Sequence, residues 1–200
     1  MSDFNSLTAS ELGDMIGQCQ IDPVELTEHF LSQIELSPIG TKIYSTVTSK
    51  LALEQAKDSK KRADLGRRLS SLDGVPISWK DLFDISGYPC EAGSELLAGR
   101  LAIKNSKVYN FAEAHGLICL GKTHMSELAF SGLGLNPVRE TPPCVNYPES
   151  VPGGSSSGAA TSVAFGLAAA GIGSDTGGSV RIPAAWNDLV GFKTTAGKIS

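Results

Sequence analysis

Two Gly-Gly-Ser turns, separated by a helix-length segment of small residues, constrain this chain more than any other feature. Glycine permits backbone angles that a side chain forbids, and it lets backbone N–H groups crowd around a bound group. Two such turns at the ends of one helix can bring two hydroxyls and several N–H groups to a single point. A serine nucleophile with an oxyanion hole requires that arrangement. The turns are Gly153-Gly154-Ser155 and Gly177-Gly178-Ser179.

Composition excludes several classes of protein. The chain has 200 residues, 41% of them hydrophobic, which suits one domain or a large piece of a bigger one. A net charge of −4 argues against nucleic acid as a partner. Four scattered cysteines and three scattered histidines predict no metal site and no disulfide framework. We also expect no cofactor. No basic leader and no apolar run of about 20 residues is present, so we expect a cytoplasmic protein without a membrane span.

Strand and helix patterns alternate, which predicts an α/β fold with a mixed twisted sheet flanked by helices. We expect residues 1–70 to form a helical segment that packs on the core, and residues 71–200 to form part of a catalytic domain. Asp22-Pro23 is a helix start signal because aspartate caps the helix and proline fits its first turn. The predicted helices cover 23–36, 48–68, 105–115, 122–130 and 156–170, and the predicted strands cover 42–47, 77–81, 117–120 and 172–174.

One segment matches the sequence pattern of a phosphate-binding loop, but the secondary structure predicted around it does not fit such a loop. Residues 116–123 match G-x-x-x-x-G-K-[ST]. Phosphate binding by such a motif needs a strand before the first glycine and a flexible loop between the glycines. Here a predicted helix precedes Gly116, and the apolar segment 117–120 is itself a predicted strand. We therefore predict that this segment binds no nucleotide.

A serine nucleophile needs a base, and no Ser-His-Asp arrangement is evident around the scattered histidines. Lysine is the alternative, since desolvation lowers its pKa and leaves the amine neutral. Lys80 stands beside Trp79 in a predicted buried strand. A lysine there is equally compatible with snorkelling to the surface or pairing with Asp81 or Asp84. The local sequence favours neither interpretation.

Four motifs taken together resemble the amidase signature family. Each motif alone is weak, but all four occur in the family's order and spacing over residues 71–200. The motifs are Gly74-Val75-Pro76-Ile77-Ser78-Trp79-Lys80-Asp81, Gly121-Lys122-Thr123, Gly153-Gly154-Ser155-Ser156-Ser157-Gly158 and Gly171-Ile172-Gly173-Ser174-Asp175-Thr176-Gly177-Gly178-Ser179-Val180-Arg181-Ile182-Pro183.

The resemblance implies an amidase that hydrolyses a carboxamide C–N bond in a small, linear substrate rather than a peptide bond. By matching position, Ser179 is the acylated nucleophile, and Ser155, after a cis peptide bond, relays its proton to neutral Lys80. The N–H groups of Thr176, Gly177, Gly178 and Ser179 are the implied oxyanion donors. For Asp175 and Arg181 we favour a structural ion pair over substrate contact.

Two alternatives remain open. One is the glutaminase-type subunit of a tRNA-dependent amidotransferase, ranked lower because segment 132–137 departs from that branch. The other is an inactive, truncated signature protein with a binding role. Family members are considerably longer, so we expect the missing part to complete the sheet and the pocket, and residues 1–200 alone to be poorly folded and inactive. A homodimer is compatible with the sequence, which identifies neither the amide nor the oligomeric state.

Overall fold

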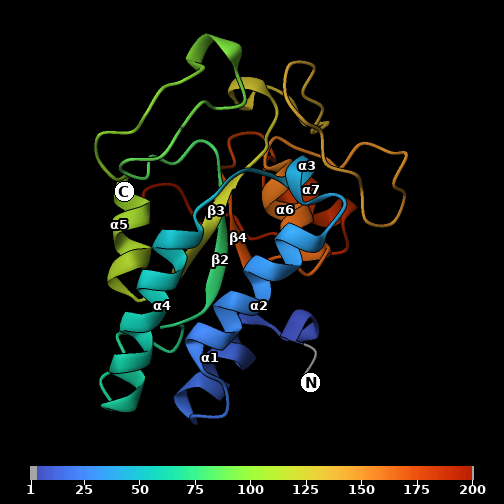
Figure 1. Ribbon diagram of the computed structural model, residues 1–200. Helices are drawn as coiled ribbons and strands as arrows, with labels where there is room; N and C mark the ends of the chain where they lie inside the picture. The colour runs from blue at the N-terminus through green and yellow to red at the C-terminus, as the bar shows by residue number, and fades with distance from the viewer. Residues whose placement is uncertain (1–3, 200) are drawn as a thin grey trace.

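A four-stranded mixed sheet forms the centre of the fold, as the alternating pattern predicts (Figure 1). The computed structural model describes residues 4–199. The strand order is β1-β3-β2-β4. Strands β2, β3 and β4 run parallel, and β1 pairs with β3 in the antiparallel sense. The strands are β1 Tyr44–Val47, β2 Pro76–Lys80, β3 Ile118–Thr123 and β4 Ala170–Ile172.

Strand β2 lies inside the sheet and is buried along its whole length. Parallel strands covered on both faces have this property, and their sequences are apolar on both sides. Ile77 and Trp79 belong to the main hydrophobic core, and Lys80 ends the strand with no exposed surface. The sheet therefore carries one lysine to the end of its interior strand.

Helices cover the sheet on the sides where their apolar residues face it. Helices α2 and α4 pack on each other and contact β3, whereas α6 contacts β2 and β4 (Figure 1). Asp22 caps α2 through the N–H of Val24, with Pro23 in the first turn, which confirms the start signal. The α-helices are α1 Ala9–Gly17, α2 Pro23–Leu36, α3 Gly40–Ile43, α4 Ser49–Asp64, α5 Lys107–Ala114, α6 Ser157–Ala164 and α7 Arg181–Trp186. The 3₁₀ turns are Phe4–Ser6, Glu95–Leu97 and Glu127–Ala129.

Long loops follow the carboxyl ends of β2 and β3. Segments 81–106 and 124–156 gather beyond this end of the sheet, at the top of Figure 1. In parallel α/β sheets, ligands bind outside the carboxyl ends of the strands. Lys80 and the segment after β4 lie at this same edge.

Two predicted helices differ most from the structure. The helix predicted over 122–130 is wrong, since Lys122 and Thr123 are the last residues of β3 and only a 3₁₀ turn follows. Leu128 and Ala129 have positive φ angles, which interrupt a helix. The helix predicted over 156–170 ends at Ala164, because Gly166 adopts a left-handed conformation with φ of 67°.

The N-terminal segment contributes to the sheet as well as covering it. Its predicted strand 42–47 corresponds to β1, which forms one edge beside β3. The predicted helix 48–68 ends at Asp64. A boundary between residues 70 and 71 stays a prediction. Within residues 4–199, no helix is both long and apolar enough to cross a membrane.

Candidate active site

Lys80 lies at the carboxyl end of β2 with its side chain completely buried. Its Nζ is 2.7 Å from Oγ of Ser155 and 2.8 Å from Oγ of Ser174. Burial lowers the pKa of Lys80 to about 7, and the carboxylate of Asp175 opposes that shift. The Lys80 amine is therefore neutral in a large fraction of the molecules near neutral pH, as a general base requires.

Neither carboxylate that could have paired with Lys80 does so. Asp81 forms an ion pair with Lys122 at 2.7 Å, and Asp84 pairs with Arg100 at 2.7 Å. Lys80 faces hydroxyls instead. Of the two interpretations that the sequence left open, the geometry favours the desolvated amine.

The first Gly-Gly-Ser turn is held against the loop after β3. The Gly154–Ser155 peptide bond is cis, as the family resemblance implies. The N–H groups of Gly153 and Gly154 donate to the carbonyls of Leu133 and Gly132, at 3.0 and 2.8 Å. Ser155 is fully buried, and its position beside Lys80 follows from these contacts.

The second turn adjoins the first. The N–H of Ser156 donates to the carbonyl of Ser179 at 3.1 Å. Ser179 is half-buried. Within residues 4–199, no hydrogen bond joins the hydroxyls of Ser179 and Ser155. The backbone thus brings the predicted nucleophile next to the predicted relay serine, without a direct bond between them.

Asp175 organises the turn that carries Ser179. Its carboxylate accepts hydrogen bonds from the N–H groups of Gly178, Val180 and Arg181 at 2.8, 3.2 and 3.3 Å. The guanidinium of Arg181 adds two bonds of 2.9 Å and holds the pKa of Asp175 far below its usual range. This geometry matches a structural ion pair rather than a substrate contact.

One predicted oxyanion donor already has a partner. The N–H of Gly178 points to Asp175, so its predicted role gains no support from the geometry. In the described part of the chain, the N–H groups of Thr176, Gly177 and Ser179 donate no hydrogen bond. These three remain the candidate donors.

Ser174 is a site residue that the sequence reasoning missed. It belongs to the last of the four family motifs, but the motif by itself gave it no role. Its hydroxyl is the second hydrogen-bond partner of Lys80. The signal available in the sequence was a serine directly before the aspartate of this motif, five residues before the predicted nucleophile.

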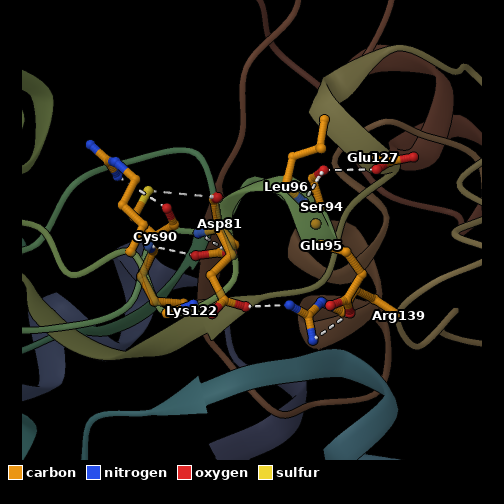
Figure 2. A network of polar contacts seen from close by, with 12 residues as sticks. Asp81, Cys90, Ser94, Glu95, Leu96, Lys122, Glu127 and Arg139 are labelled. Carbon is orange, nitrogen blue, oxygen red and sulfur yellow. Dashed lines mark hydrogen bonds and ion pairs between the residues drawn. The ribbon is translucent and has the colours of Figure 1, made fainter.

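The lysine of the phosphate-loop pattern has a structural partner. Lys122 Nζ contacts Oδ1 of Asp81 at 2.7 Å and the carbonyl of Pro89 at 3.1 Å, and its side chain is fully buried (Figure 2). Further contacts link loops 81–106 and 124–156. Arg139 pairs with Glu91 and Glu95, and Ser94 bonds to Glu127 (Figure 2). These contacts fasten the two loops that border Lys80.

A separate apolar cavity of about 560 Å³ lies beside Trp79 and Phe111. Its lining includes none of Lys80, Ser155 and Ser179. Among residues 4–199, no cluster of His, Cys, Asp or Glu side chains is placed to hold a metal ion.

Comparison with known proteins defines the class to which this fold and site belong. The Amidase family profile matches residues 25–200. A glutamyl-tRNA(Gln) amidotransferase subunit of Acinetobacter baylyi is 38% identical over all of this chain and 40% of its own length. The peptide amidase of Stenotrophomonas maltophilia superposes with a TM-score of 0.83 at 27% identity, over 91% of this chain and 39% of its own. A bacterial aryl acylamidase of the amidase signature family superposes with a TM-score of 0.81 at 30% identity. The match covers 91% of this chain and 38% of that protein.

The fold is that of the amidase signature enzymes, and the chain belongs to the amidase signature family. It spans about 40% of the length of the curated relatives that it matches.

Replacement of Lys122 by methionine tests the buried ion pair. Because Asp81 would be left buried without its partner, we expect Lys122→Met to destabilise the complete protein by about 3–5 kcal/mol. The midpoint of urea unfolding measures this loss. The double variant Asp81→Asn/Lys122→Met should recover part of it. Lys61→Met, which breaks an exposed pair with Asp58, is the matched control. Equal effects of the two single variants would contradict the interpretation.

Proposed function

We propose that the complete protein hydrolyses a carboxamide C–N bond through an acyl-enzyme on Ser179. The observation that carries the proposal is the fully buried Lys80, whose Nζ lies 2.7 Å from Oγ of Ser155. Membership of the amidase signature family supports it. The finer proposal is that the substrate is a small, linear amide rather than a peptide bond. No cofactor takes part in this scheme.

Proton transfer follows the order of the side chains. Neutral Lys80 accepts the proton of Ser155, and Ser155 accepts the proton of Ser179 as Oγ of Ser179 attacks the carbonyl carbon. The tetrahedral intermediate then expels the amine, which receives the proton back through the same relay. Water attacks the resulting ester, activated by the same base, and releases the carboxylic acid. The enzyme returns to its starting protonation state.

In this proposal, the backbone of the second turn stabilises the negative charge that develops on the substrate oxygen. The oxyanion of the intermediate would accept hydrogen bonds from N–H groups of Thr176, Gly177 and Ser179. A single preorganised donor of this kind contributes about 3–4 kcal/mol in other hydrolases. Asp175 keeps the turn in the conformation that presents these groups, since it binds three N–H groups of the segment from 178 to 181.

Probe labelling tests the nucleophile and its base. A serine-directed fluorophosphonate should form one adduct on Ser179 of the complete protein, detected by intact mass and peptide mapping. Ser179→Ala should abolish the adduct. Lys80→Ala should slow labelling by about a hundredfold or more, because it removes the general base. Ser150→Ala, at an exposed loop serine, should leave the rate unchanged. An unlabelled but folded wild type would point to the binding-only alternative.

The pH dependence of labelling tests the protonation state of Lys80. Lysine acts as a base only when neutral, so the rate should be low at acidic pH and rise with pH. The midpoint should lie near the Lys80 pKa of about 7, with a plateau above it. The residual labelling of Lys80→Ala should show no step at that pH. A wild-type midpoint near 10 would mean that Lys80 is not desolvated.

A subunit of a tRNA-dependent amidotransferase is the second candidate function. The observation that favours it is the name carried by curated relatives that are 36–39% identical to this chain. Under this proposal the protein would release ammonia from glutamine within a complex. Purification of the tagged complete protein from its native cells should then recover stoichiometric partner proteins. A free amidase should elute alone or as a homodimer and retain full amidase activity.

A further inference from the structure

A second hydroxyl contacts the amine of Lys80. Ser174, two residues after the end of β4, places its Oγ 2.8 Å from Nζ. The first hydroxyl is that of Ser155, at 2.7 Å. Within the described residues, these two side chains are the hydrogen-bond partners of Nζ. One of them has a role in the proposed relay, and the other has none.

The chemistry of a neutral amine gives the second hydroxyl a role. A neutral primary amine has two N–H donors and one lone pair. To take a proton from Ser155, Lys80 must direct its lone pair at that hydroxyl. Its N–H groups then point elsewhere, and in a buried site each needs an acceptor. Oγ of Ser174 is placed to accept one of them, which fixes the rotation of the amine about its terminal bond.

Ser174 is itself held in place by Ser156. The N–H of Ser174 donates to Oγ of Ser156, and that hydroxyl donates to the carbonyl of Ser174, both at 3.3 Å. The N–H of Ser156 also binds the carbonyl of Ser179. One residue therefore ties Ser174 to the turn that carries the proposed nucleophile. The residue whose hydroxyl contacts Lys80 is thus linked to that turn through Ser156.

We propose that Ser174 is a positioning residue that turns the lone pair of Lys80 toward Ser155. The inference rests on the proposed function, because it assigns a partner to the same base. The charged groups around Lys80 are Asp175, on the segment after β4, and Asp81, which is bound to Lys122 of β3. Neither carboxylate contacts Nζ, so Ser174 is the partner whose replacement changes the amine most directly.

The experiment compares Ser174→Thr with Ser174→Val in the complete protein. Threonine and valine have the same shape, so any crowding is common to both, and only threonine keeps the hydroxyl. The readout is the rate of fluorophosphonate labelling at Ser179 as a function of pH. Ser174→Ala removes the hydroxyl without adding bulk and gives a second comparison if both larger residues impair folding.

We expect two changes in Ser174→Val relative to Ser174→Thr. At pH 9, where Lys80 is neutral, labelling should be about tenfold slower or more, because the lone pair is no longer oriented. The midpoint of the pH profile should fall by about one unit, because the ammonium form loses an acceptor. Threonine should restore both values toward those of the wild type. A residue that only fills space would not move the midpoint.

The outcomes separate this inference from the proposed function. Equal labelling of the valine and threonine variants at pH 9 would overturn the role of Ser174 while leaving the triad intact. A slower valine variant with an unmoved midpoint would also overturn it, since the loss would not act through Lys80. A wild type that resists labelling, or that labels no faster than Lys80→Ala, would instead refute the proposed function.

Discussion

The burial of an amine at the end of the interior strand β2 is the constraint on which the site depends. A charged ammonium is costly to desolvate, so a buried lysine must either pair with a carboxylate or give up its proton. The sheet shows both solutions side by side. Lys122 on β3 is paired with Asp81, whereas Lys80 on β2 faces the hydroxyls of Ser155 and Ser174 and has a pKa of about 7. Because Asp81 is bound by Lys122, it is not available to keep Lys80 charged. The structural pair and the proposed catalytic base are therefore complementary parts of one edge of the sheet.

The two glycine-serine turns act as one unit because backbone contacts join them. Ser156 links the first turn to the carbonyl of Ser179 and to Ser174, and Asp175 gathers the N–H groups of the second turn. Groups held by several hydrogen bonds have few alternative positions. Such rigidity suits preorganised electrostatic stabilisation of a transition state. The same contacts decide which N–H groups stay available for an oxyanion. Gly178, a donor by motif, is committed to Asp175.

Family membership supports amide chemistry at a coarse level and leaves the biological role open. The proteins similar to this chain include ones named as amidotransferase subunits and ones named as amidases. The lysine-serine geometry is compatible with both proposals for the complete protein, so by itself it does not distinguish them. The chain spans about 40% of its curated relatives, and the described residues hold all three members of the proposed triad.

Local signals in the sequence determined the mixed sheet, the start of the helix at Pro23 and the motifs of the family, because capping, periodicity and glycine turns act over a few residues. Long-range pairing decided the rest. The segment from 122 looked like a helix start, but pairing with β1 and β2 placed Lys122 opposite Trp79, and Thr123 opposite Lys80, in the sheet. The partners of Asp81 and Lys80 likewise depended on strand register and on turns far apart in the chain. The spacing of residues along the sequence does not predict such contacts, since they form only when the strands assemble.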